Sequence, residues 1–271
     1  MRLHSLTAAA CAALGLAACG TAAVEPSGLL SGYDGLAVRE GTVWASIQER
    51  RDEALASGID RLFIEPAVLA PGVGEGLTDY EQALVLREVD RQICYEVSER
   101  FTVLADPAPD AGRVRAVVSR IGPTGRAASA ASAASGFFIP GPIGLRVPGT
   151  LGGLAAEAEL LAANDQGQAA AILWSRDAKA VGTDSPSLSR VGDAVQLAEP
   201  FGDAVGDAFA PEDRAVRAIA DPDPCARFGP RFRPGGFAAG FITGLYSPEL
   251  SGAQAEEDEP EAPPQAAQPD R

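Results

Sequence analysis

Four carboxylates are the leading candidates for catalytic residues in this sequence. Glu65 and Asp79 lie before and after a Gly-rich loop, and Glu157 and Glu159 alternate along one predicted strand. Two carboxylic acids across a cleft, one of them with a raised pKa, could cleave a glycosidic bond. However, the spacing sets no separation between them, and charges at alternate strand positions are typical of a solvated sheet face. Glycan hydrolysis therefore ranks third among the functions that we consider.

Other catalytic groups are scarce. The only histidine, His4, lies in the signal peptide predicted below, so the mature chain lacks an imidazole for a Ser-His-Asp mechanism or a zinc site. Lys179 has no Ser-x-x-Lys motif, and the glycines of residues 72–76 do not complete a nucleotide-binding fingerprint. Asp221 and Asp223 lack the spaced oxygen ligands of a calcium loop. We therefore predict no catalytic residue, no metal site, no cofactor and no enzymatic activity.

The N-terminal residues predict export from the cytoplasm. Arg2 precedes an apolar run over residues 6–16, which is the layout of a secretory signal peptide. A membrane-spanning helix needs about 20 apolar residues, so this run is too short to be one. Residues 1–18 are therefore expected to be removed from the mature protein.

The end of the apolar run resembles the lipobox of bacterial lipoproteins. Leu16, Ala17 and Ala18 precede Cys19, and the resemblance implies cleavage before Cys19 and attachment of a diacylglyceryl group and palmitate to it. An ordinary secreted protein with a chance cysteine is the alternative. Gly20 stands where Asp would favour retention in the inner membrane, so the resemblance implies transfer to the outer membrane, facing the periplasm.

The chain is long enough for one domain with a substantial core. Residues 19–28 are predicted to form a lipidated tether and residues 29–250 a single α+β domain, in which residues 41–58 suit an irregular helix or a covering segment. An Ala/Ser/Gly-rich insert at residues 122–152 is expected to be flexible, and the acidic tail at residues 251–271 disordered. The net charge of −15 disfavours nucleic acid as a partner.

Cys94 and Cys225 remain once the signal peptide and the lipidated cysteine are set aside. In an oxidising compartment they could form a disulfide, which the chain-entropy model values at roughly 4 to 5 kcal/mol for so long a loop. Two buried free thiols are the alternative. Because export places the chain in such a compartment, we favour the disulfide.

Two amphipathic helices are predicted. Thr78 and Glu81 have the spacing of a Thr-x-x-Glu capping box, and an apolar residue recurs at every fourth position over the following turns. Residues 191–208 have a second apolar face, although Pro200 must kink that helix. Residues 211–220 are expected to add one or two helical turns.

The strands are predicted from alternating and β-branched runs. Residues 60–68 form one strand, and residues 101–105 and 113–121 form a hairpin around a turn rich in Pro, Asp and Gly. Residues 155–163 and 168–180 form a second hairpin. The expected fold is therefore α+β: an antiparallel sheet of two hairpins plus one strand, with two amphipathic helices on one face.

Three short strings resemble a known family. They are Ser27-Gly28-Leu29-Leu30-Ser31-Gly32-Tyr33-Asp34-Gly35-Leu36, Phe63-Ile64-Glu65-Pro66 and Glu157-Ala158-Glu159-Leu160-Leu161. With the order of the elements, they resemble bacterial outer-membrane lipoproteins of the uncharacterised family known as domain of unknown function thirty-three thirteen, over residues 27–208. The resemblance implies an envelope lipoprotein and supplies neither a substrate nor a catalytic residue.

A basic and apolar segment near the C-terminal end of the domain is the candidate for membrane or partner contact. Glycines at every fourth position would line one face of a helix and allow close contact with another. Arginines followed by aromatic residues suit anionic headgroups beside a lipid anchor, although such segments more often pack on the domain's own core, as we expect here. The candidate residues are Arg227, Arg231, Arg233, Gly236, Phe237, Gly240, Phe241 and Gly244.

The predicted function is a lipid-anchored, non-enzymatic binding or accessory module for a component of the cell envelope. The alternative is a lipoprotein that self-associates as a homo-oligomer, or contacts the membrane, through the Gly-rich apolar residues 136–149 and 235–246. Exposure of Phe137, Phe138, Phe237 and Phe241 on one surface would favour this alternative.

Overall fold

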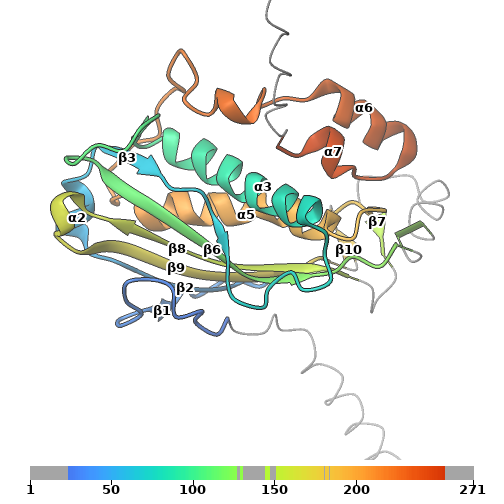
Figure 1. Ribbon diagram of the computed structural model, residues 1–271, viewed down its shortest axis with the longest axis horizontal. Helices are drawn as coiled ribbons and strands as arrows, with labels where there is room; N and C mark the ends of the chain where they lie inside the picture. The colour runs from blue at the N-terminus through green and yellow to red at the C-terminus, as the bar shows by residue number, and fades with distance from the viewer. Residues whose placement is uncertain are drawn as a thin grey trace, which may run out of the picture.

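The structure is a computed structural model that describes residues 24–126, 129–130, 144–146, 151–179, 181–182 and 184–253. The predicted signal peptide, Cys19, Phe137, Phe138 and the acidic tail from residue 254 onward lie outside the described residues. The described chain has an α+β fold, in which a mostly antiparallel sheet is covered by helices on one face (Figure 1).

One large sheet is the base of the fold. Its strands follow the order β1-β2-β9-β8-β6-β3-β5, and β4 pairs with β6 outside this path. A separate two-stranded sheet pairs β7 (Gly144–Leu145) with β10 (Val181–Gly182). The strands of the large sheet are β1 Ala37–Val38, β2 Ser46–Arg51, β3 Arg61–Ile64, β4 Val68–Leu69, β5 Thr102–Leu104, β6 Gly112–Gly122, β8 Gly153–Leu161 and β9 Gln168–Asp177.

The second predicted hairpin is present. β8 and β9 pair antiparallel around the short 3-10 helix η2 (Ala163–Asp165), where Asn164 adopts the left-handed conformation that Asn tolerates. Both faces of β8 are covered: Leu154 and Leu160 face the helices, whereas Glu157 and Glu159 lie on the other face and are buried as well. The central strands are therefore nearly continuous in apolar residues.

The first predicted hairpin is wrong. β5 and β6 do not pair with each other, because β3 lies between them and is parallel to both. The Pro- and Asp-rich residues 105–111 turn the chain as expected, but a turn signal does not specify the neighbour of the next strand. Leu62 and Ile64 of β3 are fully buried in this central position, so burial of an apolar strand decides the pairing.

Two further expectations about secondary structure are corrected. Residues 41–58 contain the strand β2 and the short helix α2 (Glu53–Ser57), which Asp52 caps through the N–H of Leu55. The charged residues of β2 obscure its pattern, because only Ile47 of this strand is buried. Residues 211–220 form turns and extended chain, not a helix.

Helices α3 (Asp79–Ser98) and α5 (Gly192–Phe209) lie side by side on one face of the sheet (Figure 1). The predicted capping box is present at the start of α3, and α5 runs through Pro200 as a single helix. Their contact is close at Gly202, where an added Cβ would lie 2.8 Å from the backbone of Gln92. A small residue is therefore required at this crossing.

A third layer covers the outer side of the helices. The 3-10 helix η3 (Ala226–Phe228) leads to α6 (Pro234–Thr243) and α7 (Pro248–Ser251) above α3 (Figure 1). Cys94 of α3 and Cys225 form the disulfide that ties this layer to the domain. Among the helices of the described residues, none is long and apolar enough to cross a membrane.

Candidate functional site

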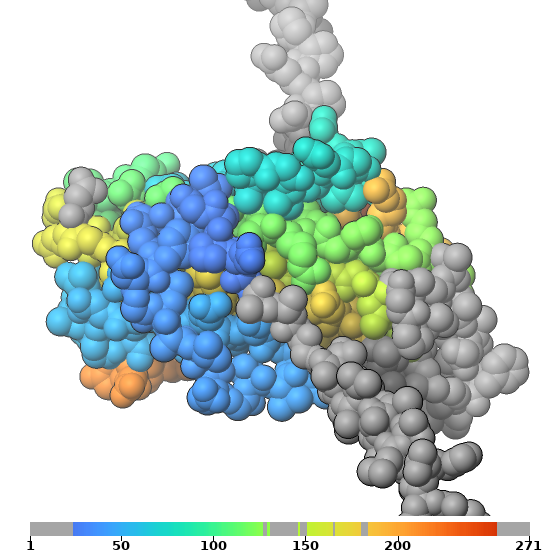
Figure 2. Space-filling view, turned by 90° about the horizontal axis from the view of Figure 1, so that it is seen from below, coloured from blue at the N-terminus to red at the C-terminus, as the bar shows by residue number. Residues whose placement is uncertain are grey.

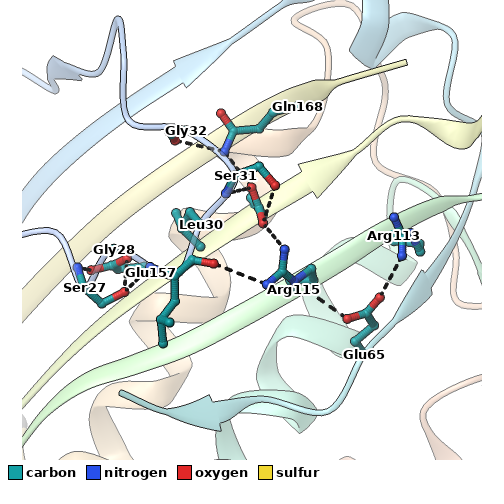
Figure 3. A network of polar contacts seen from close by, with 12 residues as sticks. Ser27, Gly28, Leu30, Ser31, Gly32, Glu65, Arg113, Arg115, Glu157 and Gln168 are labelled. Carbon is teal, nitrogen blue, oxygen red and sulfur yellow. Dashed lines mark hydrogen bonds and ion pairs between the residues drawn. The ribbon is translucent and has the colours of Figure 1, made fainter. Parts of the chain in front are cut away.

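Two buried glutamates hold the N-terminal segment, residues 24–33, on the sheet face opposite the helices (Figure 3). The Glu157 carboxylate accepts hydrogen bonds from the Ser27 N–H at 2.6 Å, the Ser27 hydroxyl at 2.9 Å and the Tyr33 hydroxyl at 2.8 Å. Three donors therefore compensate this carboxylate for its lost hydration.

Glu159 holds the next part of the same segment. Its carboxylate accepts from the Ser31 N–H at 2.9 Å, the Ser31 hydroxyl at 3.2 Å, Gln168 at 2.7 Å and the guanidinium of Arg115 at 2.9 Å. Gln168 also donates to the carbonyl oxygen of Gly32. Both glutamates are fully buried, so the solvated sheet face that their spacing suggested is wrong.

The N-terminal segment is part of the folded domain. Val24 and Leu30 pack with Val117 and Leu173 in a small apolar cluster on this sheet face. The predicted tether, which extended to Gly28, is therefore docked from Val24 onward. The predicted lipid site at Cys19 is only five residues from the first docked residue.

Three of the four carboxylates considered for glycan cleavage meet in this network. Arg115 bridges Glu159 and Glu65, with a 3.8 Å ion pair to Glu65, whereas Asp79 lies in the first turn of α3. Glu157 and Glu159 have no solvent access, and their oxygens accept hydrogen bonds from the chain. They do not provide the open acid and base that glycan cleavage requires.

A third buried glutamate holds the C-terminal end of the described chain. Glu88 of α3 accepts from the Ala253 N–H at 2.6 Å and pairs with Arg91 at 2.7 Å. Arg91 in turn donates to the Ser251 carbonyl oxygen. Burial raises the pKa of Glu88, and the positive charge of Arg91 opposes this effect. Buried carboxylates thus hold both ends of the described domain, on opposite sides of the sheet.

The arginines predicted to contact headgroups make contacts within the domain. Arg231 donates to both carboxylate oxygens of Asp223 and lies 4.1 Å from the centre of the Tyr95 ring. Arg233 is buried and donates to two backbone carbonyl oxygens, while Arg227 stacks on a phenylalanine ring. Arg231 and Arg233 therefore stabilise the third layer and are not free to bind lipid.

The three predicted glycines in and after α6 do not form one continuous contact face. Gly236 packs against α7, where an added Cβ would lie 2.4 Å from the Ser251 hydroxyl. Gly240 has an open surface, and Gly244 ends the helix in the left-handed conformation with φ 67°. Only the first glycine is therefore required for helix contact.

Three phenylalanines of the same segment are exposed, which corrects the expectation of core packing for them, whereas Phe228 and Tyr246 pack on the core as expected. Phe232, Phe237, Phe241 and Ile242 are between 67% and 85% exposed; together we call them the α6 surface. A helix of this length has few positions to bury, and α6 uses Gly236 against α7. Beside it is a cavity of about 570 Å³ lined in part by Tyr80, Leu84, Ala239, Leu245, Tyr246 and Leu250.

Comparison with known proteins identifies the family. The family model described as "Protein of unknown function (DUF3313)" matches residues 25–205. The chain belongs to this family. Two structures of the PelC dodecamer from Paraburkholderia phytofirmans, one of them a variant, are similar at 8% and 11% identity, with TM-scores of 0.34 and 0.33. Each comparison covers 60% of this chain and 97% of the PelC chain. No curated protein matches.

The DUF3313 match covers the network around Glu157 and Glu159 but not the α6 surface. It includes all of the N-terminal segment except Val24, includes both glutamates of β8, and ends before α6. The string from Ser27 to Leu36 carried part of the family resemblance. Its pattern did not reveal that Ser27, Ser31 and Tyr33 bind Glu157 and Glu159. Two acidic residues within an otherwise apolar strand were the available signal, because a strand with both faces apolar has no solvated side.

Proposed function

We propose that this DUF3313 protein is a lipid-anchored, non-enzymatic protein of the cell envelope that binds a protein partner through the α6 surface. The observation that carries the proposal is the exposure of the α6 surface, in which Phe241 is the most exposed residue at 85%. Four large apolar side chains on one short segment mark an interaction surface. A partner that covers them removes apolar area from water, at roughly 25 cal/mol per Å².

The position of the predicted anchor favours a protein partner over the membrane at α6. A chain of five residues from Cys19 to Val24 spans at most roughly 18 Å. Val24 docks on the sheet face opposite the helices, whereas α6 lies beyond the helices on the other side (Figure 1). In this proposal the lipid and the α6 surface lie on opposite sides of the domain, and α6 faces the periplasm.

Self-association is the second candidate function. The surface over Gly240 is open, since an added Cβ would meet only one atom within 4 Å, at 3.6 Å. A second copy of α6 could approach there, and an isologous dimer would cover the same phenylalanines on both copies.

A site-specific photo-crosslinker tests the proposal in intact cells. Placed at position 241, it should give an adduct with a distinct protein. The matched control is position 216, because Val216 is also exposed and apolar but lies outside α6. An adduct with twice the mass of the chain would support self-association instead. A correctly localised protein without any adduct specific to position 241 would contradict both functions.

The anchor is tested separately by mass and fractionation. We expect the protein from membranes to carry a lipid on Cys19 and to lack residues 1–18. The variant Cys19→Ala should lose the lipid mass and leave the membrane fraction, since two or more acyl chains are needed for stable anchoring. An unlipidated wild-type chain would contradict this part of the proposal.

A further inference from the structure

A second exposed apolar surface lies on the opposite side of the molecule from α6. Val38, Val43 and Trp44, in the β1–β2 hairpin (residues 37–51), are between 58% and 74% exposed. Apolar side chains of this size favour an environment that removes them from water. We propose that the hairpin rests in the interfacial layer of the membrane to which Cys19 is attached. This inference depends on the lipid attachment of the proposed function.

The hairpin adjoins the docked N-terminal segment. Leu36, which directly precedes β1, packs against the same apolar cluster as Val24. Gln168 links the two parts, because it donates to the Gly32 carbonyl oxygen and accepts from Arg50 of β2. Figure 2 views the molecule from below and shows the blue N-terminal segment and the lighter blue residues that follow it side by side on one face.

The short chain before Val24 limits where the membrane lies. Cys19 lies at most roughly 18 Å from Val24, and Val24 is buried in the domain. The segment that follows cannot swing away while Glu157 and Glu159 hold it. A bilayer that contains the Cys19 lipid must therefore come close to this face, where the hairpin is exposed.

The chemistry of the hairpin fits lipid headgroups. Tryptophan has an apolar ring and a polar N–H, and it concentrates at membrane–water interfaces. The ammonium of Lys179 lies 4.6 Å from the centre of the Trp44 ring, so a cation accompanies the indole at the depth of the lipid phosphates. Arg39 and Glu49 form an ion pair within the hairpin, which neutralises both charges beside this surface.

Tryptophan fluorescence tests the contact directly. The chain has only two tryptophans, and Trp174 is buried, so Trp174→Phe makes the emission specific for Trp44. The full lipidated protein is placed in vesicles of phosphatidylethanolamine and phosphatidylglycerol, with or without bromine on the acyl chains. We expect a blue shift of the Trp44 emission and a loss of intensity with the brominated lipids.

The matched control moves the probe to the far side. A chain with Trp44→Phe, Trp174→Phe and Phe241→Trp should show no loss, because α6 points away from the anchored bilayer. If the Trp174→Phe variant fails to fold, the test is repeated with the unsubstituted chain. Trp174 is buried, so its emission adds an equal background in both kinds of vesicle.

Three outcomes decide between the proposals. Quenching at position 44 without quenching at position 241 supports the contact. Equal Trp44 emission in both kinds of vesicle, in a chain whose mass includes the lipid, overturns the contact and leaves the anchor intact. A chain without lipid at Cys19 overturns both the anchor and the contact.

Discussion

The carboxylate of Glu157 accepts the backbone N–H of Ser27 at 2.6 Å, across 130 residues of sequence. This hydrogen bond joins the middle of β8 to the point at which the chain leaves the domain toward its predicted anchor. A fully buried carboxylate is stable only when its oxygens are satisfied. The N-terminal segment therefore completes the sheet face, and the glutamate fixes the point from which the chain runs toward the predicted anchor.

Replacing Glu157 should release the N-terminal segment. Glu157→Ala removes the acceptor of the Ser27 N–H and the charged acceptor of the Tyr33 hydroxyl, at a cost of roughly 2 to 3 kcal/mol. Urea unfolding and hydrogen exchange at residues 27–33 measure the two effects. Glu75→Gln, at an exposed loop position, is the control and should change stability by less than about 0.5 kcal/mol. Unchanged exchange at residues 27–33 would show that Glu157 does not hold the segment.

The contact between α3 and α5 should not tolerate a side chain at Gly202. An added Cβ would lie 2.8 Å from the backbone of Gln92, so Gly202→Ala should destabilise the protein by about 1 to 3 kcal/mol. Thermal unfolding followed by circular dichroism checks this loss. Gly235→Ala is the matched control, because no atom lies within 4 Å of an added Cβ there. Equal stability of the two variants would contradict the close packing.

The disulfide should stabilise the third layer. Cys94 and Cys225 are 131 residues apart, and removal of a native disulfide typically costs 2 to 5 kcal/mol. We expect the double variant Cys94→Ser/Cys225→Ser to unfold at a lower urea concentration than the oxidised protein. Peptide mapping without reduction should recover the two cysteines linked. Two free thiols in protein isolated without reductant would refute the pairing.

Two carboxyl groups between α3 and α5 should make stability depend on pH. Burial, followed by the charges of Asp203 and Glu99, raises the pKa of Glu96 from 4.5 to about 7. The folded state therefore binds this proton more tightly than the unfolded chain. Its contribution to stability is complete below pH 4.5 and is lost as the pH rises through 7.

Asp203→Asn tests this coupling, because it removes the like charge that faces Glu96. The variant should raise Tm by about 2 to 4 °C at pH 8 and by less at pH 5, where Glu96 is already protonated. Thermal scans at both pH values, with Glu75→Gln as the control, give the comparison. A gain in Tm that is equal at the two pH values would argue against the coupling.

Local patterns in the sequence were sufficient for several elements. The capping box at Thr78 and the four-residue repeat behind it predicted α3, and alternation around a polar turn predicted the pair β8 and β9. The disulfide between Cys94 and Cys225 was also predicted, because only two cysteines remained for an oxidising compartment. The helix and the strand pair follow from the period of neighbouring residues, whereas the disulfide follows from the number of cysteines.

Tertiary structure decided what those patterns left open. β3 lies between β5 and β6, Glu157 and Glu159 are buried, and the phenylalanines of α6 are exposed. The alternation of apolar and charged residues shows that a strand has two faces. It does not show which distant segment covers each face. Burial of Glu157 depends on a segment 130 residues away. The phenylalanines of α6 are exposed because no other part of the described chain covers them. Strand order and burial are therefore set by long-range packing, which no local window of sequence contains.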